Sequence, residues 1–193
     1  MRILTYSECA EWCAQRDYPI RPSAAGFVET DLTASVSAAV DLEPPQFHFV
    51  RFTTPTDSGR RVWLAKFLYL LLAPAPELLI WLGDSAVWPS GQHMPLFIRF
   101  RETFGEERPL IKAPGHILNP EEKDDAISII SVSLIFMWNC HILSASGRDA
   151  VFTSHDEFGW FASRDAPIVK SVEGRLRGAI GQSTDMKNLE SPA

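Results

Sequence analysis

The sequence contains few cysteines, and their arrangement does not predict a disulfide framework. Cys9, Cys13 and Cys140 are the three cysteines of a 193-residue chain, an odd number that suits the reducing cytosol. Cys9 and Cys13 are four residues apart, so a helix would place both on one face. A zinc site could use that spacing, but the nearest histidine in the sequence is His48. We therefore expect buried thiols and no metal.

The sequence also lacks an uninterrupted apolar run long enough to cross a bilayer. Pro74 and Pro76 divide the apolar stretch Val62–Leu82 into a predicted helix and a predicted strand. The second apolar run, Ala126–Trp138, is too short for a membrane span. Met1–Tyr6 is followed by polar residues and not by the apolar core of a signal peptide. These features predict a cytoplasmic protein without a membrane segment.

Basic residues are outnumbered by acidic ones. The chain has 18 Lys and Arg against 24 Asp and Glu, for a formal net charge of −6. A surface that binds phosphates along a nucleic acid needs clustered positive charge. We therefore expect no nucleic-acid partner.

No recognised catalytic template is present either. The sequence has no H-E-x-x-H helix, no G-x-S-x-G turn and no Walker loop. Ser154 and His155 are adjacent, but a nucleophile and its base must meet through space and not along the chain. The sequence predicts no cofactor and favours a protein that is not an enzyme.

Large apolar side chains are abundant. Hydrophobic residues make up 46% of the chain, with six Trp and twelve Phe, enough to bury a core without metals or disulfides. The fold we predict is α+β, a small mixed sheet packed with helices and ending in a C-terminal hairpin. Residues 1–165 would form one domain, and residues 166–193 a weakly structured helix and tail.

Strands are predicted where apolar residues alternate with polar ones or form short unbroken runs. Leu78–Leu82 is unbroken and bounded by Gly83, which suits a central strand buried on both faces. The other predicted strands are Arg2–Thr5, the alternating segment Phe47–Phe52, and a hairpin of Asn139–Ser146 and Asp149–Thr153 joined at Gly147-Arg148.

Helices are predicted where a capping residue precedes an apolar periodicity. The clearest start is Asn119-Pro120, followed by two acids. The other predicted helical segments are Ser7–Asp17 capped by Ser7, a helix capped by Asp57 or Ser58, Gln92–Phe104 regular from Pro95, a piece within Leu32–Val40, a short turn from Asp156 to Phe161, and a weak helix after Asp165.

The segment from Trp88 to Gly105 is the most informative part of the chain. It follows the predicted central strand, and ligands of open α/β sheets bind at such strand ends. Trp88 and Ser90 form a sharp turn there, and Arg99 and Arg101 follow on the predicted helix. One arginine could bind an anion while the other pairs with a nearby acid. Alternatively, both arginines extend over the Trp88 ring and only support the fold.

Two later clusters carry the remaining candidate chemistry. His116 follows Pro114-Gly115 in a predicted turn, and His155, Asp156 and Glu157 are consecutive. A metal-binding or acid/base role would require folding to bring His116 and His155 together. Otherwise these side chains cap turns through local hydrogen bonds.

These motifs carry a resemblance. Trp88-Pro89-Ser90, Arg99-x-Arg101, Pro114-Gly115-His116 and Ser154–Glu157 resemble those of a family of small bacterial proteins for which no activity is established. The likeness covers residues 49–161. It implies a common fold and a shared polar surface, but no reaction. Members favour an acid where this chain has Gln92 and another where it has Asn139, so a site that needs those carboxylates would be impaired here.

The sequence therefore predicts a cytosolic binding protein, of the immunity or regulatory kind, that contacts a protein partner through the surface near Trp88. The competing hypothesis is a metal-dependent or acid/base hydrolase. In it, His116 and His155 with Asp156 and Glu157 do the chemistry, and Arg99 or Arg101 holds an anionic substrate. A third possibility is assembly of the chain with itself.

Overall fold

The computed structural model describes residues 1–22, 38–40, 46–83 and 94–180. Its centre is a seven-stranded sheet with strand order β1-β6-β5-β7-β8-β9-β4. The strands are β1 (Arg2–Leu4), β4 (His48–Thr53), β5 (Leu78–Gly83), β6 (Gly115–Leu118), β7 (Asn139–Ser144), β8 (Asp149–Thr153) and β9 (Phe158–Ser163). A separate two-stranded sheet pairs β2 (Ile20–Pro22) with β3 (Ala38–Val40).

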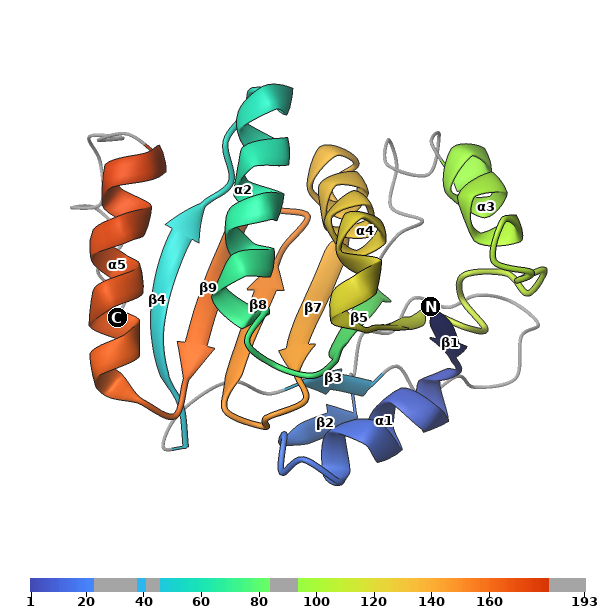
Figure 1. Ribbon diagram of the computed structural model, residues 1–193, viewed down its shortest axis with the longest axis horizontal. Coiled ribbons are helices and arrows are strands. Elements are labelled where there is room, and N and C mark those ends of the chain that lie inside the picture. Colours follow the sequence, from blue (N-terminus) through green and yellow to red (C-terminus); the bar gives the residue numbers. More distant parts are fainter. Residues whose placement is uncertain (23–37, 41–45, 84–93, 181–193) are drawn as a thin grey trace.

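The predicted α+β class is confirmed, but the large sheet is not mixed. Every pair of neighbouring strands runs antiparallel. A parallel pair would need a connection that crosses over the sheet. The helix between β5 and β6 stands beside the sheet instead, so the chain returns antiparallel to β5 (Figure 1).

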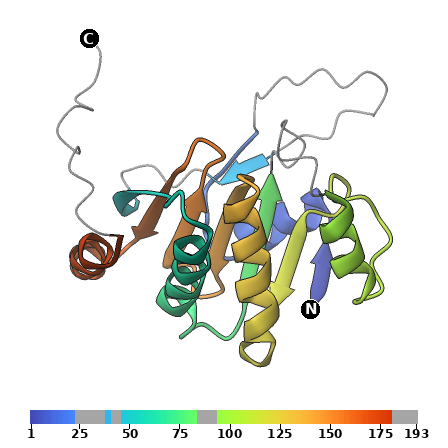
Figure 2. The same ribbon diagram turned by 90° about the horizontal axis from the view of Figure 1, so that it is seen from above.

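Helices cover one face of the sheet, which we call the helical face. They are α2 (Ser58–Leu72), α4 (Lys123–Ile135) and α5 (Ala166–Ile180), which lie side by side (Figure 2). The remaining helices are α1 (Tyr6–Ala14), α3 (Met94–Glu102) and the single 3-10 turn η2 (Pro120–Glu122). Within the described ranges, no helix combines the length and the apolar character needed to cross a membrane.

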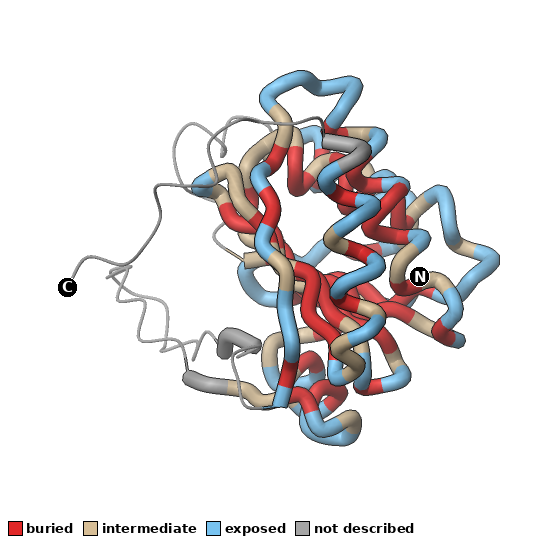
Figure 3. Tube along the Cα trace, turned by 90° about the vertical axis from the view of Figure 1, so that its left-hand side faces the viewer, coloured by how far each residue is buried: buried red, intermediate tan, exposed pale blue. Residues whose placement is uncertain are grey.

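The central strand β5 is buried on both sides, as predicted. Leu78, Ile80 and Leu82 belong to the larger core on the helical face. Leu79 and Trp81 point to the opposite face, which we call the second face, and join a smaller core there. Figure 3 shows the buried residues concentrated in the strands and on the helix sides that pack against them. The alternation gives both faces apolar surface to bury.

Most helix starts agree with the sequence, with one shift. Asp57 caps α2 by accepting a hydrogen bond from the amide of Arg60 at 2.8 Å. The first helix is capped by Thr5 and not by Ser7, because Thr5 and Glu8 form a reciprocal capping box. The helix ends at Ala14, short of the predicted Asp17.

The predicted hairpin is present, and a third strand extends it. β7 and β8 pair as predicted, but the residues expected to form a helical turn toward Phe161 form β9. Ala38–Val40, the last part of the predicted helical piece Leu32–Val40, is strand β3, and the rest of that piece lies outside the described residues. After Asp165 the chain forms α5, which places Val169, Val172 and Leu176 in the larger core.

Candidate functional site

The sequence singled out Trp88, Ser90, Arg99 and Arg101 as a binding surface. Trp88 and Ser90 lie in the segment 84–93, outside the described residues. Arg99 is exposed on α3 and pairs with Glu102, its Nη1 2.7 Å from Oε2. This arrangement matches the expectation that one arginine of the pair meets a nearby acid.

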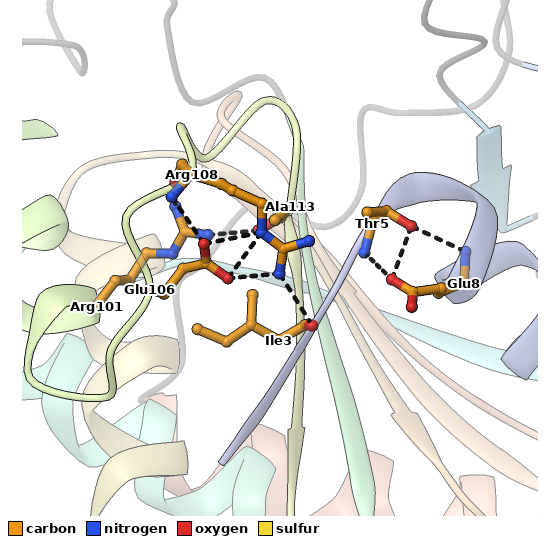
Figure 4. A network of polar contacts seen from close by, with 7 residues as sticks. All are labelled: Ile3, Thr5, Glu8, Arg101, Glu106, Arg108 and Ala113. Carbon is orange, nitrogen blue, oxygen red and sulfur yellow. Dashed lines mark hydrogen bonds and ion pairs between the residues drawn. The ribbon is translucent and has the colours of Figure 1, made fainter.

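Arg101 is buried and supports the fold. Its side chain is 1% exposed, and it donates hydrogen bonds to the carbonyl oxygens of Arg108 at 3.0 Å and Ala113 at 2.7 Å. Figure 4 shows this guanidinium beside Glu106, which itself accepts from Arg108. The hydrogen bonds from the Arg108 side chain are the main reason that the pKa of Glu106 falls to about 2. Arg101 thus organises the loop between α3 and β6 and is not positioned to bind an external anion.

His116 lies in the larger core on the helical face and not in a turn. It is a residue of β6 with 0% exposure, opposite Ile80 in the register, and its ring meets Phe97 edge-on at 5.7 Å between centroids. Neither ring nitrogen makes a hydrogen bond of good geometry, although the backbone of Ile80 and of Pro114 lies close enough to oppose the lowering of the pKa. Burial, followed by the charge of Arg101, lowers the pKa of His116 to about 3. The ring is therefore neutral at physiological pH.

His155 and Asp156 lie in the turn between β8 and β9. The Oδ1 atom of Asn139 accepts from the His155 amide at 2.8 Å and is 2.9 Å from its Nδ1. Because an amide oxygen only accepts hydrogen bonds, Nδ1 carries the proton in this contact. The other ring nitrogen, Nε2, lies 3.4 Å from Oδ1 of Asp156. The imidazole is thus held in one orientation by Asn139.

Glu157 is held by Arg61 of α2. Nη2 of Arg61 lies 2.9 Å from Oε1 of Glu157. The same guanidinium donates to three carbonyl oxygens, those of Pro55, Leu134 and Ile135. This contact fastens the β8–β9 turn to the end of α4, so Glu157 has a structural role.

The structure does not bring the two predicted histidines together. The side chains of paired strand residues share a sheet face, so His116, opposite Ile80, is on the helical face. Asn139 and Leu143 are four residues apart on β7, so their side chains point to the same face of the sheet. Leu143 belongs to the smaller core, and the contact between Asn139 and His155 is therefore on the second face. Across the part of the chain that is described, no group of three or more His, Cys, Asp and Glu side chains is placed to hold a metal ion.

The structure does bring together a set of rings on the second face. We call the following residues the aromatic row: Trp81, His141, Phe152, Trp160 and Phe49. The first four come from β5, β7, β8 and β9 and are direct cross-strand partners. Their successive ring centroids are 6.4, 4.8 and 5.8 Å apart, and Phe49 of β4 lies 6.1 Å from Trp160. The row therefore crosses five adjacent strands.

The row becomes more exposed from the centre of the sheet to its β4 edge. Trp81 is buried, the next three rings are half-buried, and Phe49 is 48% exposed. Arg51 of β4 is opposite Trp160 in the register, and its guanidinium carbon lies 4.3 Å from the ring centroid of Phe158. Arg51 thus lies at the exposed end of the row, with its guanidinium over the Phe158 ring.

Sequence reasoning missed this row and the role of Arg61. The pattern Phe158-x-Trp160 has the period of two that predicts a strand, but the two preceding acids suggest a helix start. The sequence predicts strands at His141 and Phe152, but the tertiary fold decides which strands pair. For Arg61, no local pattern indicates its carbonyl partners Leu134 and Ile135, which are 73 and 74 residues away in the sequence.

No protein-family model, no curated protein and no solved structure matches this chain.

Proposed function

We propose that this chain is a cytosolic, non-enzymatic module that binds a protein partner, and that the aromatic row with Arg51 is its contact surface. The observation that carries the proposal is the direct cross-strand alignment of His141, Phe152 and Trp160, each half-buried, beside the exposed Phe49. The free thiols of the three cysteines suit a reducing compartment.

Such a row fits the known anatomy of protein interfaces. Trp, Tyr and Arg dominate the binding energy of interfaces, usually as anchors at the centre of a patch. Here each ring is fixed by a neighbour on the adjacent strand, so little side-chain freedom remains to be lost on binding. Arg51 at the rim offers five N–H donors to a carboxylate or carbonyl of the partner.

The placement of the other candidate residues supports binding over hydrolysis. His116 is neutral in the core, Glu157 pairs with Arg61, and Arg101 donates to backbone carbonyls. His155 and Asp156 remain at the surface, beside the side-chain amide of Asn139. A hydrolase built on these residues would need more of them in one place.

The proposal can be tested by capture from extracts of the native host with immobilised protein. We would compare the wild-type chain with Trp160→Ser and Phe49→Ser, and use Trp63→Ser as the matched control. Trp63 is also exposed, at 41%, but belongs to α2 on the helical side. We expect a partner that the wild type and Trp63→Ser retain and that both variants in the row retain at least tenfold less.

Two results would contradict this proposal. One is that no protein is retained reproducibly by the wild type. The other is that Trp63→Ser weakens retention as much as Trp160→Ser does, because the effect would then not depend on the row. Circular dichroism of each variant shows whether it is folded before the comparison is made.

A further inference from the structure

We propose that β4 pairs with β4 of a second copy of this chain, in a two-fold antiparallel arrangement that joins the two sheets into one. This inference does not depend on the proposed partner protein. It rests on the edge of the large sheet, on the exposed residues of β4 and on the register that they allow.

Within the described residues, β4 is paired on one side only. It is the last strand in the sheet order, and its neighbour is β9. The amide of Thr54 donates to the carbonyl of Glu157 at 2.8 Å, which shows which way the backbone groups alternate. The N–H and C=O groups of Phe49, Arg51 and Thr53 therefore point away from β9. The side chains of all three residues are exposed.

This edge carries only part of the protection that edge strands usually have. Native proteins block such edges with proline, charged side chains, bulges, very short strands or a covering helix or loop. Here Arg51 supplies one charge, and α5 packs against β4. β4 has six residues, HFVRFT, with neither proline nor lysine, and all six pair with β9 without a bulge. An edge of this kind is a template for an added strand.

One register makes the edge complementary to itself. Two-fold pairing of antiparallel strands can place Phe49 opposite the partner's Arg51, and Arg51 opposite the partner's Phe49. Both belong to the outward-pointing set, so each pair exchanges two backbone hydrogen bonds. Both side chains are on the second face, where an arginine beside a phenylalanine ring gains a cation–π contact. Val50 then faces the partner's Val50 across the two-fold axis.

The neighbouring registers are less favourable. A shift by two residues in one direction places Arg51 opposite the partner's Arg51, and like charges directly opposite each other destabilise a sheet. The opposite shift places Phe49 opposite the partner's Phe49, but pairs only His48–Val50 with the same residues of the partner's β4. The Phe49–Arg51 register pairs His48–Phe52 of the two copies and continues the aromatic row from one copy into the other.

Size-exclusion chromatography with light scattering gives the direct test. We expect the wild-type chain to have twice the 21.6 kDa mass of one chain. Phe49→Lys places a lysine opposite the partner's Arg51 and should raise the dissociation constant at least tenfold. Phe49→Glu removes the same ring but places a carboxylate opposite that arginine, and should retain the dimer.

This pair of variants separates the dimer from the proposed function. Both lack the Phe49 ring and should weaken binding of another protein alike, whereas their effects on the dimer should be opposite. A monomeric wild type up to about 100 µM, a concentration at which even weak specific pairs associate, would overturn the inference. Equal effects of Phe49→Lys and Phe49→Glu on the dimer would also overturn it.

A cysteine crosslink tests the register itself. In a non-hydrogen-bonded pair, facing Cα atoms are about 4.5 Å apart, within disulfide range. Val50→Cys should therefore form a disulfide-linked dimer under mild oxidation, while Trp63→Cys should not. The native cysteines are buried and do not compete. Equal crosslinking of the two variants would mean that the chains meet at random.

Discussion

Arg61 of α2 and Glu157 of the β8–β9 turn form an ion pair, with Nη2 of Arg61 2.9 Å from Oε1 of Glu157. The arginine is buried, whereas the glutamate side chain is 43% exposed. The two partners should therefore contribute unequally to stability, because removal of Arg61 leaves three carbonyl oxygens without this donor, whereas Gln in place of Glu157 keeps an acceptor for the buried guanidinium.

We expect Arg61→Met to lower the free energy of unfolding by about 2–4 kcal/mol, since the carbonyls of Pro55 and Leu134 would lose their donor. Glu157→Gln should cost less, about 1 kcal/mol, because the amide oxygen of Gln can still accept a hydrogen bond from Arg61. Urea unfolding followed by circular dichroism measures both. A larger loss for Glu157→Gln than for Arg61→Met would contradict the structural role assigned to Arg61.

The paired arginines of α3 should also respond differently. Arg101→Met removes a buried guanidinium that binds two carbonyl oxygens, so we expect a loss of about 2–4 kcal/mol. Arg99→Met removes an exposed ion pair and should change stability by less than about 0.5 kcal/mol. The two variants serve as controls for each other in thermal or urea unfolding. Similar losses for both would show that Arg101 does not brace the loop.

Gly115 is needed because α1 approaches the sheet closely at that point. A Cβ atom at Gly115 would meet Sγ of Cys9, and the next nearest atom would be Cβ of Leu4 at 3.1 Å. Gly115→Ala should therefore destabilise the fold by about 1–3 kcal/mol through overpacking. The double variant Cys9→Ala with Gly115→Ala should recover part of that loss, because the sulfur is gone. Failure of Cys9→Ala to recover any stability in the double-variant cycle would rule out this contact as the cause.

The buried His116 should make stability depend on pH. Its folded-state pKa is about 3, below the ordinary value of 6.5. Between pH 3 and pH 6.5, the unfolded chain therefore binds a proton at His116 that the folded chain does not. The contribution of neutral His116 to the free energy of unfolding is fully present above pH 6.5. It is lost as the pH falls toward 3, by about 1.4 kcal/mol per pH unit.

Urea unfolding between pH 6.5 and 4.5 tests this expectation. His116→Leu should show a shallower decline than the wild type over that interval. His141, whose pKa burial lowers to about 4, still titrates in the variant and leaves a residual slope. If His116→Leu and the wild type had the same slope, the folded-state pKa of His116 could not be depressed.

The core strands and helix starts could be predicted because their signals are local. Leu78–Leu82 is an unbroken apolar run, and Asp57 caps the helix that it precedes. The antiparallel pairing of β5 with β6 could not be predicted in the same way, because it depends on where α3 packs. β9 was not predicted because Asp156 and Glu157, which precede it, suggest a helix start.

The candidate site was harder to predict than the fold. The sequence draws attention to polar residues within apolar segments, such as Arg101 and His116. Both side chains are buried inside the fold. A surface made of Phe152 and Trp160 depends on the register between strands. That register is a long-range property, and a single sequence carries little information about it.

The position of β4 in the sheet has a consequence for the order of assembly. β7, β8 and β9 follow one another along the chain, so two short turns suffice to build them, whereas His48 of β4 must find Ser163 across most of the sequence. Distant pairings of this kind carry a larger entropic cost of closure. The amides of β4 should thus exchange with deuterium sooner than those of β8, and a second copy bound there would slow that exchange.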